Sequence, residues 1–292
     1  MNILVSTIGQ GLIWSLLAIG LYITFRILDF PDMTVEGSFP LGAAIAVINI
    51  HSGNSIFYSM ILAFVGGAIA GLVTALLYTK LKIPVLLSGI LTMTALYSVN
   101  LRVLKKANLS LLNNKTIFSF MQDLPPNFNI IVIGIIFISI IILLLSIFLN
   151  TEMGQALIAT GDNEVMAESL GVSTDNMKII GLMVSNGLVA LTGSLVAQQS
   201  GYADITMGIG VIVIGLAAII IGEVAFGDLS LTNRIIAIVI GSIIYRLILL
   251  VVLQLGFNPN DLKLISAIIL AICLALPTVR GRAKHLLKRG IK

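Results

Sequence analysis

Charge is scarce in this sequence. Only 10% of its 292 residues are Asp, Glu, Lys or Arg, whereas 58% are hydrophobic and the mean hydropathy is +1.10. Soluble domains carry roughly 25% charged residues, so this chain has too little polar surface to cover a globule in water. The single cysteine, Cys273, lies within an apolar run, which excludes an internal disulfide framework and a cysteine-rich metal site. The composition therefore predicts an integral membrane protein.

Catalytic and nucleotide-binding motifs are also missing. The sequence has no Gly-x-x-x-x-Gly-Lys-Ser/Thr phosphate loop, so energy for any transport must come from a partner or from an ion gradient. It has no Gly-x-Ser-x-Gly elbow and no His-Glu-x-x-His pair, and its two histidines, His51 and His285, lie at opposite ends of the chain. We expect no catalytic residue, no metal site and no cofactor bound by this chain.

The apolar residues fall into long runs. Crossing the hydrocarbon core takes about 20 apolar residues per helix, and lipid offers no hydrogen bonds to the backbone, so each run must be helical or buried in protein. The runs predict an all-α polytopic membrane protein of about 8–10 transmembrane helices, some of them broken or re-entrant. They cover residues 3–25, 39–50, 56–78, 83–101, 130–149, 177–199, 207–226, 235–253 and 264–276.

Basic residues set the expected orientation. Six of the last thirteen residues are Lys or Arg and directly follow an apolar run, which is typical of a cytoplasmic tail and not of a nucleic-acid reader. We therefore expect a transmembrane domain over residues 1–279 and a basic cytoplasmic tail over residues 280–292. Each span changes the side of the membrane, so counting the spans back from this tail places residues 102–129 on the outer side. The segments expected inside are 150–176, 227–234 and the turn at Lys80 and Lys82.

Two segments depart from plain hydrophobic helices. Residues 39–50 are too short to cross a membrane alone, contain Pro40 and follow the carboxylates of Asp29, Asp32 and Glu36. Short segments interrupted by proline or glycine are where transporters place irregular backbone that lines a pathway. An ordinary polar loop is the alternative, and the number of spans before residue 56 stays open.

Residues 207–226 form the second such segment. They include four glycines, with Glu223 near the inner end. These glycines either loosen the helix or allow close helix packing, as we expect for Gly67 and Gly71, which are four residues apart.

Residues 151–176 form the one long loop expected in the cytoplasm. Asp162 is placed to cap a short helix, Glu164 falls in its first turn near the positive end of the helix dipole, and Gly171 is a natural stop. An amphipathic helix of this kind can dock in a partner's groove, or it can lie on the inner face of the bundle. Its acidic side disfavours an anionic membrane surface. The apolar side consists of Val165, Met166, Ala167 and Leu170, and the acidic side of Glu164 and Glu168.

The loop resembles that of a known family. Residues 154–163 read Gly-Gln-Ala-Leu-Ile-Ala-Thr-Gly-Asp-Asn, residues 167–172 read Ala-Glu-Ser-Leu-Gly-Val, and Lys178 follows in the next helix. This pattern resembles the cytoplasmic loop of ABC-importer permeases of the branched-chain amino acid and ribose type, and the similarity runs over nearly the whole chain. Residues 29–42, Asp-Phe-Pro-Asp-Met-Thr-Val-Glu-Gly-Ser-Phe-Pro-Leu-Gly, resemble a subgroup of amino acid permeases that includes some for tryptophan or tyrosine.

The resemblance implies a multi-pass permease subunit in the plasma membrane of a prokaryote, which forms the translocation pathway of an amino acid importer. It also implies three protein partners: a cytoplasmic ABC ATPase that uses ATP, an extracellular substrate-binding protein, and a second permease copy, most simply an identical one. The loop then contains the coupling helix, although it has Ala-Glu-Ser where other importer families have Glu-Ala-Ala. The residues expected to meet the ATPase are Asp162, Asn163, Glu164, Met166, Ala167, Glu168, Leu170 and Gly171.

An amino acid carries an ammonium and a carboxylate group that must cross without being held tightly. We therefore expect weak polar contacts between apolar walls, with high affinity left to the binding protein. For Glu36, we expect hydrogen bonds from free amides at a helix start, capping the helix near Phe39, because burying an unpaired carboxylate is costly. A solvated loop acid is the alternative. The candidate pathway residues are Thr34, Glu36, Ser38, Thr92 and Asn186.

Two other classes of protein compete with the importer permease. A secondary transporter driven by an ion gradient would carry ionisable residues deep in several spans, and here only Glu223 and Arg246 lie well inside a run. An intramembrane enzyme with a metal held by Asp29, Asp32 and Glu36 has no second matching motif. Copurification with an ABC ATPase separates the first class from these two.

Overall fold

The computed structural model describes residues 2–112, 114–121, 125, 127–227, 229–258 and 261–289, with the backbone alone for residues 2, 121 and 276–289. Within these ranges the chain folds into eleven α-helices and one two-stranded antiparallel ladder. Six helical segments are long and apolar enough to cross a membrane, and three shorter apolar helices accompany them. The described part of the chain thus confirms the prediction of an all-α polytopic membrane fold.

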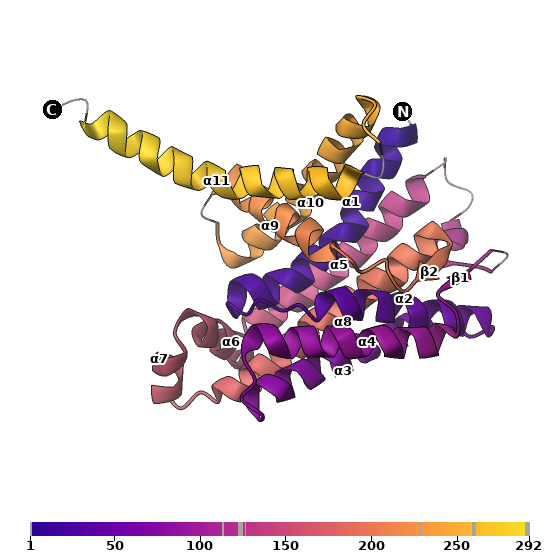
Figure 1. The fold of residues 1–292 in the computed structure, drawn as a ribbon, viewed down its shortest axis with the longest axis horizontal. Helices are drawn as coiled ribbons and strands as arrows, with labels where there is room; N and C mark the ends of the chain where they lie inside the picture. The colour runs from indigo at the N-terminus through magenta and orange to yellow at the C-terminus, as the bar shows by residue number, and fades with distance from the viewer. Residues whose placement is uncertain are drawn as a thin grey trace.

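Each of the nine predicted apolar runs falls on one helix (Figure 1). The long spans are α1 (Asn2–Leu21), continued by a π-helix (Tyr22–Ile27), α3 (Ile56–Thr79), α4 (Val85–Leu104), α5 (Phe128–Leu149), α8 (Thr174–Ser200) and α10 (Leu231–Gln254). The shorter apolar helices are α2 (Val35–His51), α9 (Val211–Phe226) and the start of α11 (Leu262–Arg289). Two loop helices, α6 (Glu152–Asp162) and α7 (Glu164–Ser169), a 3₁₀ turn (Ile117–Met121) and strands β1 (Asn108–Ser110) and β2 (Tyr202–Asp204) complete the described elements.

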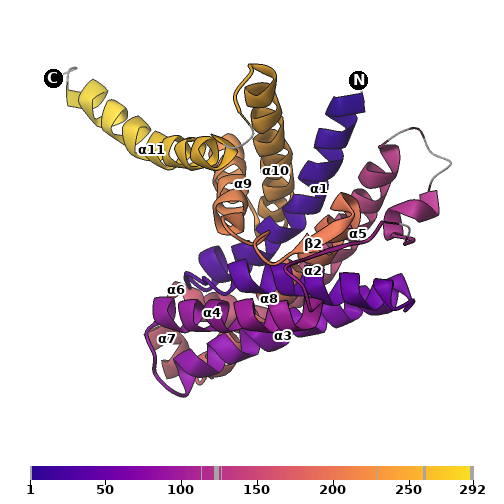
Figure 2. The same ribbon diagram turned by 45° about the vertical axis from the view of Figure 1, so that its right-hand side comes forward.

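Helix α8 forms the centre of the bundle. Its most apolar stretch is 72% buried, the largest share among the six spans. In Figure 2, α2, α3, α4 and α8 run side by side across the view, whereas α1, α9 and α10 stand upright against them. Gly67 and Gly71 let α3 approach α8 closely, because a Cβ atom at either position would overlap the carbonyl oxygen of Asn186 or Leu182. The pair therefore has the close-packing role that its spacing predicts.

The loops gather at two ends of the bundle. At one end, Lys82 Nζ lies 3.8 Å from Asp175 Oδ2, which brings the turn between α3 and α4 beside the first turn of α8. At the other end, the backbone amide of Ile117 donates to Gln198 Oε1 at 3.0 Å, and β1 pairs with β2. The turn at Lys82 and the loop before α8 thus lie at one end and residues 108–117 at the other, as counting back predicts. Which end faces the cytoplasm stays a prediction.

The start of α2 lies inside the bundle. The first span ends at Ile27, an irregular stretch follows over residues 28–34, and Ser38 in the first turns of α2 already contacts Asn186 near the middle of α8. The prediction of a short helix after an irregular segment is therefore confirmed. The reading of residues 29–38 as an ordinary polar loop is wrong, because Asp32 and Thr34 are fully buried.

The boundary expected between residues 279 and 280 falls inside α11, whose backbone stays helical to Arg289. The side chains of the predicted basic tail lie outside the described residues. The division into a transmembrane domain and a tail stays a prediction.

We expect Gly71→Leu to destabilise the bundle, because the added side chain must displace the backbone of α8. Overpacking typically costs about 1–3 kcal/mol. Thermal unfolding of the detergent-purified protein, followed by size-exclusion chromatography, measures the change. Val73→Leu, on the exposed side of the same helix, is the matched control and should leave the midpoint unchanged. An equal midpoint for both variants would contradict the close α3–α8 contact.

Candidate functional site

Helix α7 forms because a polar cap starts it and a glycine ends it. The side chain of Asn163 accepts a hydrogen bond from the amide of Met166 at 3.0 Å, with the extended backbone expected of an N-cap. Glu164 lies in the first turn, as predicted, and Gly171 follows the helix with φ +85°, a conformation that favours glycine. The prediction that Asp162 is the cap is wrong by one residue, because Asp162 ends α6. Asp and Asn cap equally well, so their order alone did not decide between them.

Polar contacts of Lys178 and Thr174 hold α7 against the start of α8. Lys178 is 6% exposed, and its ammonium pairs with the carboxylate of Glu164 and lies 3.3 Å from the hydroxyl of Tyr78. The hydroxyl of Thr174 donates to Glu168 Oε1 at 2.8 Å. The acidic side of α7 is therefore partly used for internal contacts, which the sequence pattern alone did not indicate.

The apolar side of α7 faces away from the bundle. Val165, Met166 and Leu170 are 78%, 50% and 74% exposed, whereas Ala167 is fully buried. The helix thus does not lie with its apolar side on the bundle. It presents three apolar side chains at the end of the molecule that also carries α6 (Figure 1).

A second polar cluster lies inside the bundle, where α2, α3 and α8 meet. Asn186 donates from Nδ2 to Asp32 Oδ2 at 2.6 Å, and its Oδ1 accepts from the hydroxyl of Ser38 at 2.6 Å. Asp32 Oδ1 accepts from the amide of Thr34 at 2.9 Å. The hydroxyls of Thr34 and Thr74 lie 2.6 Å apart. All five side chains are fully buried.

Most of the predicted pathway residues belong to this cluster or lie near it. Ser38 and Asn186 hydrogen-bond to each other, whereas the hydroxyl of Thr34 lies against that of Thr74 and the amide of Asn186 donates to Asp32. Thr92 is buried on α4 and donates to the carbonyl of Ser88 at 3.0 Å. Their assignment to a substrate pathway stays a prediction, since in this conformation they hold helices together. In the sequence, Asp32 is only one of three nearby carboxylates, and no local pattern predicts its place as the acceptor at the centre of the network.

Glu36 is placed differently from its neighbours. Its Oε1 accepts a hydrogen bond at 2.9 Å from the amide of Gly210, the residue that precedes α9. The expected bond from an amide at a helix start is confirmed. The expected helix is wrong, because Glu36 itself lies in the first turn of α2 and reaches α9 instead. Glu36 also lines a cavity of about 300 Å³ between α2, α4 and residues 205–209.

The segment between β2 and α9 forms the far wall of that cavity. Hydrogen bonds from the hydroxyl and amide of Thr206, and from Asn108, hold the pKa of Asp204 below its usual value against the opposing effect of partial burial. Gly208 packs on the backbone of α2, since a Cβ there would overlap the carbonyl oxygen of Glu36. The wall is thus fixed both at its start and against α2.

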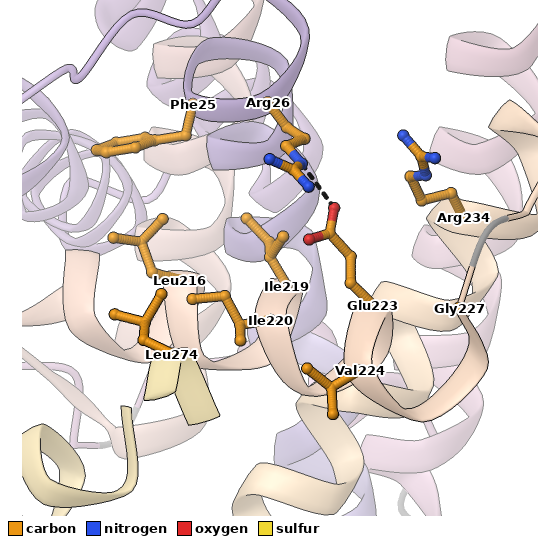
Figure 3. A pocket seen from close by; sticks show the side chains of 10 residues that line it. All are labelled: Phe25, Arg26, Leu216, Ile219, Ile220, Glu223, Val224, Gly227, Arg234 and Leu274. Carbon is orange, nitrogen blue, oxygen red and sulfur yellow. Dashed lines mark hydrogen bonds and ion pairs between the residues drawn. The ribbon is translucent and has the colours of Figure 1, made fainter. Parts of the chain in front are cut away.

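A larger cavity, of about 580 Å³, opens beside the end of the first span (Figure 3). Arg26, on the π-helix, donates from Nε to Glu223 Oε1 at 2.8 Å, and Arg234 points toward the pair from the start of α10. Phe25, Leu216 and Leu274 form an apolar wall. Glu223 is thus paired, and the other ionisable residue deep in a run, Arg246, lies over the ring of Trp14, with Cζ 4.3 Å from the ring centroid.

The three carboxylates of residues 29–36 do not converge. Asp29 is exposed, Asp32 is fully buried and Glu36 points toward α9. Among the described residues, no three His, Cys, Asp or Glu side chains gather as a metal site would need. The structure therefore gives no support to the metal-dependent enzyme.

The chain is similar in sequence to known membrane permeases. The family model described as a branched-chain amino acid transport system permease component covers residues 3–275. A tyrosine transport system permease protein of Clostridioides difficile is 44% identical over 275 residues, which are 94% of this chain and 91% of that protein. An uncharacterized protein of Rickettsia prowazekii is 39% identical over 94% of this chain and 98% of its own length. The autoinducer 2 import system permease protein LsrC of Yersinia pseudotuberculosis is 28% identical over 89% of this chain and 72% of its own length. No solved structure matches the chain.

The helical membrane bundle and these matches define an importer permease, the membrane-spanning subunit of an ABC transporter and not itself an enzyme. Within that class, the chain belongs to the family of permease components of branched-chain amino acid transport systems.

We expect Asn186→Leu to destabilise the protein, because it leaves Asp32 and Ser38 buried without their partner. An unsatisfied buried polar group costs about 1–3 kcal/mol. The thermal midpoint in detergent measures the loss, and Thr94→Val, at an exposed position of α4, is the control. If Asn186→Leu is as stable as the control, the network does not hold these helices together.

Proposed function

We propose that this permease imports an amino acid, with aromatic amino acids such as tyrosine as the first candidates. This proposal rests on the similarity to the tyrosine transport system permease protein of Clostridioides difficile, which is 44% identical over 94% of the chain. The sequence of residues 29–42 supports it, since it resembles amino acid permeases of the same subgroup. Uptake of radiolabelled L-tyrosine by cells that express the complete transporter, compared with L-leucine and D-ribose, tests the substrate class.

The end of the molecule that carries α6 and α7 faces the cytoplasm in this proposal. A separate ABC ATPase, which binds and hydrolyses ATP, docks on the exposed side chains of Val165, Met166 and Leu170. An ion pair holds this short helix in place, and its three exposed apolar side chains are suited to binding in a hydrophobic groove. The contact through the buried Lys178 then transmits movement of α7 directly to α8, the central helix.

The opposite end, with β1 and β2, faces outward and receives an extracellular substrate-binding protein. The ladder and the turn fixed by Asp204 give this end a defined surface. Two permease copies, most simply identical ones, enclose the pathway in the plasma membrane of a prokaryote, since one chain supplies one coupling helix. The C-terminus lies in the cytoplasm, as the basic residues after the last apolar run indicate.

The runner-up is a secondary transporter driven by an ion gradient. Such a protein needs ionisable groups that load and release ions within the membrane. Glu223 is paired with Arg26, and Arg246 stacks on Trp14. Neither contact favours a role for Glu223 or Arg246 in carrying ions through the membrane. The ATP-driven importer therefore remains the preferred proposal.

We expect Leu170→Asp to abolish transport while the permease still folds. Leu170 is 74% exposed in the isolated chain, so the charge is tolerated until the ATPase buries it. Burying an unpaired carboxylate costs roughly 2 kcal/mol or more, which weakens ATPase binding more than about tenfold. Copurification with the ATPase and uptake by whole cells measure the effect.

Two controls accompany this variant. Leu170→Ala keeps the surface apolar, and Asn176→Asp adds the same charge at an exposed position beyond α7. Both should retain ATPase binding. Wild-type uptake by Leu170→Asp with the ATPase attached would refute docking at α7.

Purified permease without its partners should show no tight substrate binding. A pathway that releases its substrate on each cycle needs only weak contacts, and affinity belongs to the binding protein. Titration of the detergent-purified chain with radiolabelled L-tyrosine should give no site of roughly micromolar affinity or tighter. A tighter site would favour the secondary transporter.

A further inference from the structure

The cavity beside Glu36 has the size and lining of a small-molecule site. Its volume of about 300 Å³ is at the lower end of the ~300–1,000 Å³ typical of such sites. Three different parts of the chain form it: the first turns of α2, one face of α4, and the segment before α9. The second and third parts are held to the first by Asn100, which donates to the carbonyl of Gly37 at 3.1 Å, and by the bond between Gly210 and Glu36.

Two hydrogen-bond acceptors at the wall of this cavity can each accept a further hydrogen bond. Within the described residues, the carboxylate of Glu36 has one hydrogen bond, from Gly210, and no ion pair. Asn100 is 1% exposed, and its Oδ1 is buried with no hydrogen-bond partner among the described residues. Nearly all buried polar atoms in proteins are satisfied, so an orphan acceptor beside a cavity indicates a missing donor. The amide of Asn100 binds the residue next to Glu36, so both acceptors belong to the same part of the wall.

A cation with several N–H groups matches both acceptors. A carboxylate and an amide oxygen accept hydrogen bonds and donate none, whereas an ammonium group donates three. A carboxylate ligand would be repelled by Glu36, and a neutral hydroxyl would leave its charge uncompensated. The polar part of the cavity therefore selects an ammonium group.

The rest of the lining is apolar or aromatic. Met93 and Tyr97 lie on α4 one turn apart, and Ile209 faces them from the segment before α9. Tyr97 is 53% exposed, and Thr94 beside it is exposed as well. A hydroxyl-bearing stripe in the middle of an apolar helix suits a polar passage better than a lipid contact. A ligand side chain can rest on this stripe while its ammonium reaches Glu36.

We propose that this cavity is a low-affinity subsite in which Glu36 and Asn100 receive the ammonium group of an amino acid in transit, while Met93 and Tyr97 contact its side chain. The assignment rests on the proposed transport of amino acids. It extends that function to Asn100, Met93 and Tyr97, which are not among the pathway residues predicted from the sequence, and it names the ammonium as the group that Glu36 receives.

Thiol labelling tests the charge preference of the cavity without a substrate. In a Cys273→Ser background, Thr94→Cys supplies a single reporter thiol on the cavity wall. We compare its reaction with an ammonium-bearing reagent, 2-aminoethyl methanethiosulfonate, and a sulfonate-bearing one, 2-sulfonatoethyl methanethiosulfonate. For each protein we divide the rate with the ammonium reagent by the rate with the sulfonate reagent. This ratio should be about fivefold or more higher with Glu36 than with Glu36→Gln. Gln can accept the same hydrogen bond from Gly210 and removes only the charge.

Three further variants make the result decisive. Glu36→Asp retains the charge and should retain the preference. Asp261→Asn, which removes an exposed acid outside the cavity, should not change it. Ile209→Lys, at a position 57% exposed, places a resident ammonium in the cavity and should abolish the preference whether or not Glu36→Gln folds. An unchanged ratio in both Glu36→Gln and Ile209→Lys would overturn the subsite.

Protection by ligands identifies the occupant. At millimolar concentration, L-tyrosine and tyramine should slow labelling by the uncharged methyl methanethiosulfonate, whereas 3-(4-hydroxyphenyl)propionate, which lacks the ammonium, should not. The assignment would be overturned if the propionate protected the thiol as well as L-tyrosine does. It would also be overturned if none of the three compounds protected it. If the importer carries another class of substrate, L-tyrosine uptake fails while the charge preference persists. If the subsite is wrong, the charge preference is absent while uptake persists.

Discussion

Polar groups inside a membrane protein must find their partners within the chain, because lipid supplies no hydrogen bonds. In this permease the constraint is met around α8. Asn186 uses both ends of its amide, toward Asp32 and toward Ser38, and so ties the irregular segment before α2 to the central helix. Gly67 and Gly71 bring α3 close enough to join the same network through Thr74. Without these contacts, the break between α1 and α2 would expose backbone and a carboxylate to an environment that cannot solvate them.

The break in turn positions the functional surfaces. Because α2 starts inside the bundle, its first turn carries Glu36 to the amide that precedes α9, and a cavity is left between these helices and α4. At the other end, α6 packs on the last turn of the first span, where a Cβ at Gly161 would overlap the carbonyl of Ile27. The ion pair of Lys178 with Glu164 then links α7 to α8. The loop helices are thus connected to the same central elements that border the cavity.

The candidate site shows where sequence reasoning succeeds and where it stops. The cap, the first-turn acid and the stop of α7 are local signals within nine residues, and the helix lies where they predict, with its cap shifted from Asp162 to Asn163. The expectation that Glu36 meets an amide at a helix start follows from the cost of an unpaired carboxylate. Which helix provides that amide depends on a contact 174 residues away, and nothing in the local pattern indicates it. Asn100 was overlooked for the same reason, since an orphan acceptor is recognisable only when its surroundings are known.

The sequence by itself determined the class of fold, the position of nine apolar helices and the short helix of the loop, because these depend on hydropathy and on neighbours within a few residues. It also indicated the family, through the composition and order of the loop residues. The tertiary structure alone decided that Asp32 accepts from Asn186 and from the amide of Thr34, that Ser38 donates to Asn186, and that Glu36 lines a cavity instead. Side chains adjacent in sequence on α2 point in different directions around the helix. Their partners come from α3, α8 and the start of α9, and only the packing of those helices fixes which polar group is enclosed and which is left open.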